Sequence, residues 1–450
     1  MKPKPCLGNL AVLVLSLGLL AMACQRPEEP PISDEKVGEI TDEGQVMPVN
    51  QTVSPYGSYL PLPSLRPQAL AISPDGRLVA VSGKTSELVI IDPDDLKIRQ
   101  KVNLPAEEQT EPPAGVTSAN IPEPDKRGQL SYNGLIFSPD GRYIYLSNVN
   151  GSIKVFSVDQ NGLVKPFKTI ILPPAGAPGR KEEIPAGLAL SQDGQKLYVG
   201  GNLSNTLLEI EAGSGQTLRQ MPVGVAPYEV VLLGPKAYVS NWGGGRPGPG
   251  DTVGPAGRGT AVKVDQEKFV ACEGSVSVID LTSGQMVKEI ITGLHASDLA
   301  LSPDRKYLVC ANAAADNLSV IDTARDQVVE TIWVKRSPAD LFGASPNALC
   351  FSPDGRRLYV ANGTQNAVAV VDFRPGKKKS SLAGLIPAGW FPGAVAWDKQ
   401  RGQLWVANIK GLADRPQTDE KTGMTGFNSH QYTGSVSVFK PPAKKQLKSL

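Results

Sequence analysis

Short apolar runs alternate with turn residues along most of the chain, and this pattern repeats. The tetrad Ser-Pro-Asp-Gly stands at 73–76, 138–141 and 352–355, and weaker versions stand at 191–194, 233–236, 302–305 and 398–401. Each tetrad follows an apolar run and precedes a run that resembles Tyr-Val-Ala-Asn. A third and a fourth β-rich run complete the unit, as at 276–280 and 285–290. Proline, aspartate and glycine suit the successive positions of a tight turn, so each tetrad predicts a hairpin.

Seven units of four short strands predict an all-β chain, a seven-bladed β-propeller with four-stranded blades over residues 45–440. The last unit ends at its third run, 436–439, and prolines follow at 441 and 442. We therefore expect an N-terminal strand to close the ring, and we assign it to the segment from Gln45 to Val53. A chain starting near Pro61 should then be destabilised or aggregate.

The long connections are expected on one face of the propeller. Turns between the first and second and between the third and fourth strands are short, whereas the other connections include 105–130, 173–184, 243–273, 335–344 and 409–433. In an up-and-down blade, the two long types of connection emerge on the same face, which we call the long-loop face. Insertions gathered on one face favour a binding function there.

The first 45 residues have the pattern of an export signal and a tether. Lys2 and Lys4 precede an apolar run at 10–22, which is too short to cross a bilayer comfortably, so 1–23 is predicted to be a signal peptide. The run ends at Leu-Ala-Met-Ala-Cys24, which resembles a bacterial lipobox and predicts lipidation of Cys24; ordinary cleavage after Ala23 is the alternative. Residues 24–44 are acidic and poor in apolar residues, as in a flexible tether. Residues 441–450 form a basic tail, which, like Lys377 to Lys379, is interpreted as solvated.

Composition limits the chemistry. The chain has 46 Lys and Arg against 44 Asp and Glu, so no overall field draws it to nucleic acid. Its two histidines, His295 and His430, argue against a haem or multi-histidine metal enzyme, and we expect no metal site and no cofactor. Three cysteines remain outside the leader and Cys24, which is no disulfide framework, and Cys310 is expected to be a buried thiol.

The repeats resemble the YVTN β-propeller family, which is YncE-like, over roughly residues 45–440. The segments 238–244, 293–295, 344–349 and 389–394 are similar to the propeller half of bacterial proteins that pair it with an alkaline-phosphatase-like phosphoesterase domain. The resemblance implies a β-propeller. The sequence stops at Leu450, without the metal cluster and nucleophile of that phosphoesterase, so its activity is not carried over. A separately encoded phosphoesterase partner is one hypothesis.

Candidate site residues gather where the inner strands begin on the long-loop face. A mixed polar and aromatic rim there suits a small polar ligand or a peptide; its members are Arg66, Asn133, Tyr228, Trp242, His295, Asn347 and Trp390. The simpler interpretation is that the aromatic rings fill space between blades. Asparagines end the second strand in five blades and form either a polar ring around the channel mouth or local turns; they are Asn148, Asn241, Asn312, Asn362 and Asn408.

Two functional hypotheses follow, with a third held open. The first is an exported, lipid-anchored propeller, periplasmic or surface-facing, that binds a partner protein or small ligand through the long-loop face. The second is a lactonase-like hydrolase in which His295 acts as a general base at the channel mouth. A metal site built from both histidines with Asp251 or Asp298 is not expected. A self-assembling envelope protein is the third.

Overall fold

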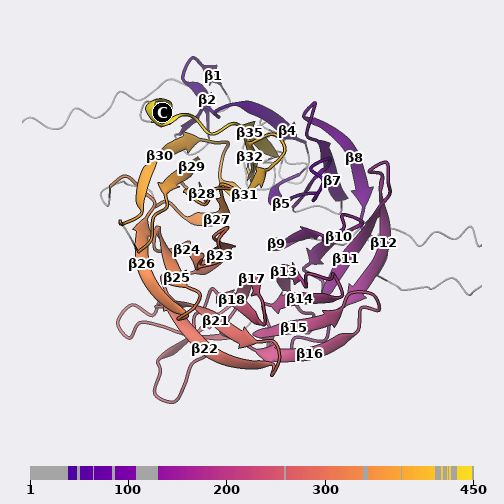
Figure 1. Cartoon of the computed structure of the whole chain (residues 1–450), viewed down its shortest axis with the longest axis vertical. Coiled ribbons are helices and arrows are strands. Elements are labelled where there is room, and N and C mark those ends of the chain that lie inside the picture. Colours follow the sequence, from indigo (N-terminus) through magenta and orange to yellow (C-terminus); the bar gives the residue numbers. More distant parts are fainter. Residues whose placement is uncertain are drawn as a thin grey trace, which may run out of the picture.

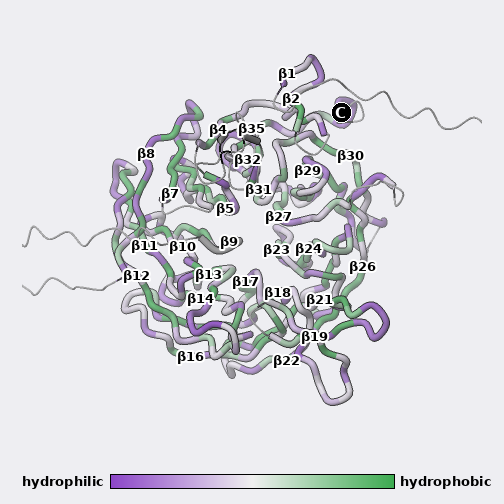
Figure 2. Tube along the Cα trace, turned by 180° about the vertical axis from the view of Figure 1, so that it is seen from behind, coloured by the Kyte–Doolittle hydropathy of each residue, from purple (hydrophilic) through white to green (hydrophobic). Residues whose placement is uncertain are grey.

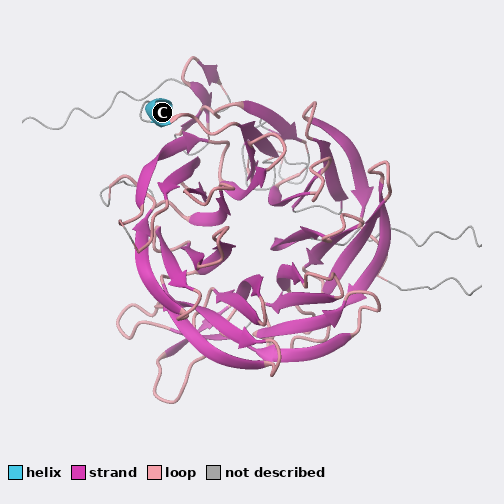
Figure 3. Cartoon of the chain, viewed as in Figure 1, coloured by secondary structure: helices cyan, strands magenta, loops and turns pink. Residues whose placement is uncertain are grey.

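The computed structural model describes residues 39–450, apart from 48–50, 64, 84–86, 108–129, 258–259, 338–342, 377, most of 411–432, and 448–449. Cys24, His430, the leader and most of the predicted tether therefore lie outside the described residues. Seven four-stranded antiparallel sheets stand around a common centre, so the chain is a seven-bladed β-propeller, as the sequence predicts (Figures 1 and 3).

Each blade runs from an inner to an outer strand. Blade 1 consists of β5 (Pro67–Ile72), β6 (Val79–Gly83), β7 (Glu87–Asp92) and β8 (Lys97–Asn103). Blade 2 consists of β9 (Leu130–Phe137), β10 (Tyr143–Asn148), β11 (Ser152–Val158) and β12 (Val164–Ile171). Blade 3 consists of β13 (Pro185–Leu190), β14 (Lys196–Gly201), β15 (Thr206–Glu211) and β16 (Thr217–Pro222). Blades 4 and 5 are β17 (Pro227–Leu233), β18 (Lys236–Asn241), β21 (Gly274–Asp280), β22 (Gln285–Thr292); and β23 (Ala296–Leu301), β24 (Tyr307–Asn312), β25 (Asn317–Asp322), β26 (Gln327–Trp333). Blade 6 is β27 (Pro346–Phe351), β28 (Arg357–Asn362), β29 (Ala367–Asp372), β30 (Ser381–Pro387); blade 7 is β31 (Pro392–Asp398), β32 (Gln403–Asn408), β35 (Gly434–Phe439), β4 (Ser58–Leu62).

The repeated tetrad makes the hairpin between the inner two strands. In blade 1, the Ser73 hydroxyl donates to Asp75 at 2.6 Å and accepts from the backbone N–H of Leu78 at 3.0 Å. Gly76 has a φ of 64°, a conformation that glycine adopts without strain. The same serine–aspartate contact recurs in blade 2, where the Ser138 hydroxyl lowers the pKa of Asp140 to about 2.

Packing between blades supplies the core. The second and third strands are almost entirely buried, because each blade presses both faces against its neighbours, as the unbroken apolar runs predict. The core cluster of blades 1 and 2 includes Ile90 and Phe156, both fully buried. Figure 2 shows the resulting alternation of hydrophobic strands and hydrophilic turns. Burying one such side chain contributes about 1.5–3 kcal/mol.

An N-terminal strand closes the ring, but it lies later in the chain than the sequence predicted. β4 pairs antiparallel with β35, from Ser58 opposite Val438 to Leu62 opposite Gly434. The segment from Gln45 to Val53 was the wrong choice: there β2 (Gly44–Val46) and β3 (Thr52–Val53) join β1 (Ile40–Thr41) in a separate small sheet. Its first two strands begin within the segment assigned to the tether.

Proline explains the misassignment. Pro61 lies inside β4, and prolines usually exclude a segment from a sheet. β4 is the outermost strand of its blade and pairs on one side only, so an outward-facing residue needs no N–H. Leu62, which is 1% exposed, anchors the strand in the core between blades 7 and 1.

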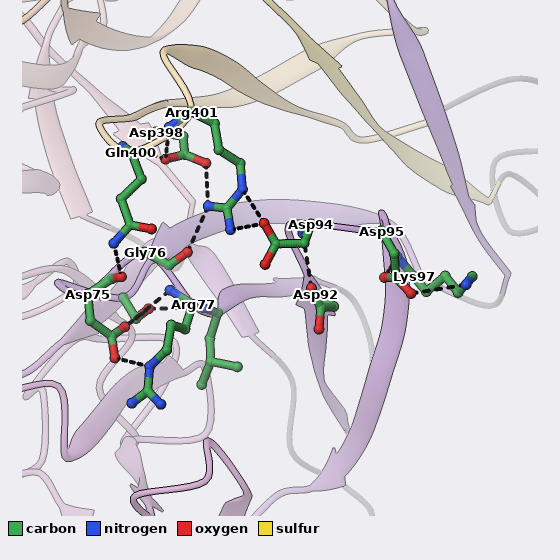
Figure 4. Close-up of polar contacts among 12 residues, drawn as sticks. Asp75, Gly76, Arg77, Asp92, Asp94, Asp95, Lys97, Asp398, Gln400 and Arg401 are labelled. Carbon is green, nitrogen blue, oxygen red and sulfur yellow. Dashed lines mark hydrogen bonds and ion pairs between the residues drawn. The ribbon is translucent and has the colours of Figure 1, made fainter.

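A polar clasp also joins blade 7 to blade 1 at the face opposite the long loops (Figure 4). The Arg401 guanidinium donates to Asp94 of blade 1 at 2.5 Å, to the Gly76 carbonyl at 2.9 Å and to Asp398 of its own blade at 3.0 Å. Gln400 donates to the Asp75 carbonyl beside it. The two ends of the ring are therefore held by a strand pairing and by side chains.

We predict that a chain starting at residue 63 loses cooperative melting or aggregates, because β35 then has an unpaired edge and the core around Leu62 opens. A chain starting at residue 54 lacks β1 to β3 but keeps β4, and serves as the control. Calorimetry should find the control near the parent; equal melting of the two truncated chains would contradict closure by β4.

Candidate functional site

A repeated turn places His295 at the long-loop end of an inner strand. The residue just before the inner strand has a left-handed φ in blades 4 to 7: 55° at Ala226, 54° at His295, 48° at Ser345 and 60° at Phe391. His295 is the titratable side chain among these four equivalent positions. Its direction is thus set by the backbone of the blade rather than by a variable loop.

Three aromatic rings stack across the boundary between blades 4 and 5. Tyr228, in β17, stacks on Trp242, which follows β18, with centroids 4.8 Å apart and planes at 19°. Trp242 stacks in turn on His295 at 5.7 Å and 20°. Tyr228 is buried, Trp242 is half-buried and His295 is exposed, so the stack rises from the interior to the surface.

Two carboxyl groups lie on β17 and β23, the inner strands of the same two blades. Glu229, in β17, reaches over Gly187 of blade 3 and accepts a hydrogen bond from the Asn133 amide of blade 2 at 2.7 Å. A Cβ on Gly187 would lie 2.6 Å from the Glu229 Oε1, so glycine keeps this path open. This hydrogen bond joins blade 4 to blade 2 across blade 3, so the Glu229 and Asn133 side chains both lie on the inner side of the ring.

Asp298, the second carboxyl, is held between blades 5 and 6. Its two oxygens accept the backbone N–H groups of Leu299 at 2.8 Å and of Leu349 at 2.6 Å. Within the described residues, no lysine, arginine or histidine forms an ion pair with Asp298 or with Glu229. The site therefore holds two neighbouring acids without a cation.

Burial and mutual repulsion change the protonation of this pair. Burial, with the charge of Asp298 as the next cause, raises the pKa of Glu229 to about 8. Burial raises the pKa of Asp298 to about 7, against the two backbone hydrogen bonds that lower it. His295 is exposed on one side only, and partial burial of its ring against Trp242 lowers its pKa, which favours the neutral imidazole at pH 7. Two neighbouring carboxyls that resist double ionisation can donate and accept protons at the same pH.

The remaining rim residues lie elsewhere. Asn347 donates to the Pro392 carbonyl at 3.4 Å and links blades 6 and 7. Trp390 is 3% exposed, packed under Met47 and Val53 of the small N-terminal sheet. The ammonium of Lys410 lies 4.9 Å from the Trp390 ring centroid. Burial, and after it the charge of Arg66, lowers the pKa of Lys410.

Asn241 lies beneath the rim and is fully buried. Its amide donates to the hydroxyls of Ser275 and Ser277 at 3.1 and 3.0 Å, which ties the second strand of blade 4 to the third. Asn312 and Asn408 make equivalent contacts with serines of their own blades. In these three blades the asparagine amide therefore joins the second strand to the third, rather than bonding to the backbone of a turn.

Sequence reasoning missed Glu229 and gave Asp298 only a passing metal role, although a signal for both exists. Glu229 and Asp298 stand four residues before the tetrads of blades 4 and 5. The equivalent position in the other five blades is Ala or Gly, at 69, 134, 187, 348 and 394. A carboxylate stands there in blades 4 and 5 alone. Within the described ranges, no three His, Cys, Asp or Glu side chains gather as a metal site requires.

Comparisons with known proteins agree with this architecture. The family model described as "Lactonase, 7-bladed beta-propeller" matches residues 134–223 and 268–384, less than half of the chain. Among solved structures, Kuenenia stuttgartiensis hydrazine synthase is 18% identical, with a TM-score of 0.54 over 79% of this chain and 96% of that chain. A structure of U3-55K is 9% identical, with a TM-score of 0.57 over 84% of this chain and 97% of that chain. No curated protein matches the chain. At these identities the structures share the propeller fold, and the fold is what they establish.

We predict that Glu229→Gln flattens the loss of stability with rising pH. A carboxyl whose pKa is higher in the folded chain than in the unfolded chain stabilises the fold at low pH and loses that effect as pH rises through about 7–8. Melting temperatures of the parent should therefore fall between pH 6.5 and 8.5 by more than those of Glu229→Gln. Parallel pH profiles for the two proteins would show that the pair does not titrate in this range.

Proposed function

We propose that the chain is an exported, lipid-anchored propeller that binds a small polar ligand at the long-loop end of the inner strands of blades 4 and 5. The observations that carry the proposal are the Tyr228–Trp242–His295 stack of blades 4 and 5 and the two acids, Glu229 and Asp298, on the inner strands of the same blades. Stacked rings offer a flat apolar face, and the acids offer acceptors or one donor, which together suit a ring-shaped ligand with polar substituents.

The predicted leader and Cys24 support export and anchoring. Among the described residues, no helix is long and apolar enough to cross a bilayer. Attachment through the lipid on Cys24 would leave the propeller outside the membrane, with its long-loop face open to solutes. Mass spectrometry of the chain purified from membranes tests this part: the first residue should be a diacylated or triacylated Cys24.

A second candidate, lactonase-like hydrolysis, is favoured by the match to the lactonase propeller model and by the raised pKa values of Glu229 and Asp298. Water would attack the lactone carbonyl carbon while His295 or the ionised acid accepts its proton. The ring C–O bond then breaks, and the protonated acid donates its proton to the leaving oxygen. The product is a hydroxy acid, and no oxidant or cofactor is needed.

We predict that one panel separates the two functions. Sugars, amines, lactones, phosphomonoesters and phosphodiesters are screened by thermal shift and for hydrolysis. A ligand of this site should raise the parent melting temperature, and Trp242→Ala or His295→Ala should weaken its binding by about tenfold or more, because stacking is lost. Turnover that His295→Ala abolishes would support hydrolysis.

Ser345→Ala is the matched control, because Ser345 has the same left-handed position in blade 6. It should keep the binding and activity of the parent. Binding that survives in both ring variants would place the ligand elsewhere and contradict the proposed site.

A further inference from the structure

The fold brings three basic segments, separate in the sequence, to the outer edge of blade 6. The first is Lys335–Arg336, which follows β26, and the second is the turn between β29 and β30, with Arg374, Lys378 and Lys379. The third is the C-terminal tail, which includes Lys440, Lys444 and Lys445. We call these residues the blade-6 basic patch. Figure 2 shows hydrophilic segments near β26, and Figure 1 places the C-terminal helix next to β30.

The tail is fixed on blade 6 rather than free. In α2 (Lys444–Leu447), the Leu447 side chain is 1% exposed and packs on β30 at Gly384. A Cβ on Gly384 would lie 2.6 Å from the Leu447 Cγ, so the contact needs a glycine. Lys444 also pairs with Asp372 at 3.4 Å.

Most of the positive charge in this patch is uncompensated. Three nearby acids already have partners. Asp372 pairs with Arg357 and Lys444, and Asp316 pairs with Lys335. Glu330 accepts hydrogen bonds from the backbone N–H and the hydroxyl of Ser380. Within the described part of the chain, Arg336, Lys378, Lys379 and Lys445 have no carboxylate partner, and all four are exposed. A chain with nearly equal numbers of acids and bases has thus concentrated bases on one edge.

An exposed tryptophan lies in the same surface. A groove of about 830 Å³ runs between β26 and β30, lined by Trp333, Arg336, Lys379 and Leu447 among others. Trp333 is 55% exposed, and Val329, four residues earlier on β26, is 48% exposed. Tryptophan beside lysine and arginine is the composition that favours the headgroup level of an anionic bilayer.

The N-terminal segment also meets the propeller at blade 6. Gln51, just before β3, accepts a hydrogen bond from Asn366 at 2.9 Å, and the Tyr56 N–H donates to the Pro387 carbonyl of β30 at 3.0 Å. Fourteen residues lie between Cys24 and Glu39, the first described residue, and the tether predicted there would span about 20 Å if it is a coil. A lipid on Cys24 would therefore lie on the side of the ring where the N-terminal segment contacts blades 6 and 7.

From these contacts we infer that the blade-6 basic patch docks on an anionic lipid surface. The inference rests on the proposed anchor, which would bring the chain to a membrane. The attraction of the blade-6 basic patch to anionic lipid does not require the anchor. Lysine and arginine side chains meet lipid phosphates while Trp333 enters the interface. Contact through an outer edge leaves the long-loop face, with the Tyr228–Trp242–His295 stack, open to solution.

Vesicle co-sedimentation of the unlipidated chain tests this inference separately from the anchor. The probe is the chain from residue 24 with Cys24→Ser, mixed with vesicles of phosphatidylglycerol and phosphatidylcholine in equal parts, or of phosphatidylcholine alone. We expect binding to the anionic vesicles only. The triple variant Lys378→Gln, Lys379→Gln, Lys445→Gln should bind at least about tenfold more weakly, because each basic residue near the surface contributes to the attraction.

A triple variant with the same net charge is the control. Lys101→Gln, Lys165→Gln, Lys268→Gln removes exposed lysines from blades 1, 2 and 4 and should bind like the parent. Trp333 fluorescence should shift to the blue with anionic vesicles, and Trp333→Phe should remove that shift. Equal weakening in both triple variants, or no binding to either vesicle, would overturn the inference, whereas unlipidated Cys24 with intact vesicle binding would refute the anchor alone.

Discussion

The strand pairing between β4 and β35 is the constraint on which the rest of the molecule depends. The first and last strands of the ring come from segments more than 370 residues apart in the chain, and their hydrogen bonds complete blade 7. Blade 7 then presses on blade 1 through Leu62 and Trp405, and Arg401 fastens the other face to Asp94. A closed ring fixes the distance between every pair of neighbouring blades.

That fixed spacing makes the acid pair possible. Glu229 and Asp298 stand on adjacent inner strands, and their oxygens are held by groups from blades 2 and 6. An open or loosened ring would let the two carboxyls separate and hydrate, which would return their pKa values to the ordinary range. The aromatic stack depends on the same boundary, since Trp242 belongs to blade 4 and His295 to blade 5. Both halves of the candidate site are therefore consequences of ring geometry rather than of a flexible loop.

Much of the fold could be predicted from the sequence, because each blade repeats the same local pattern of apolar runs and turn residues. The tetrads gave the hairpins, their number gave the blades, and the missing last strand gave closure by the N-terminal part of the chain. The closing strand itself was misassigned, because Pro61 hides an edge strand. Tyr228, Trp242 and His295 were expected in one rim and do meet, whereas Trp390 is covered by Met47 and Val53.

The acid pair and the basic patch were harder for a common reason: each joins residues distant in sequence. Glu229 is an ordinary strand residue until blades are aligned and Gly187 is seen to leave room for it. Lys378 and Lys445 belong to separate basic runs in the sequence. The packing of Leu447 on Gly384 brings the C-terminal run to blade 6, where Lys378 lies. Repeats reveal equivalent positions, but only the folded ring shows which of them touch.

Blades 4 and 5 hold two acids that resist simultaneous ionisation near neutral pH. A carbon-13 NMR titration of side-chain carboxyls measures this directly, with Glu229 and Asp298 assigned from the signals lost in Glu229→Gln and Asp298→Asn. The account predicts that both carboxyls titrate well above the ordinary range, with the last proton leaving near pH 7–8. Completion of both titrations near pH 4 would contradict it.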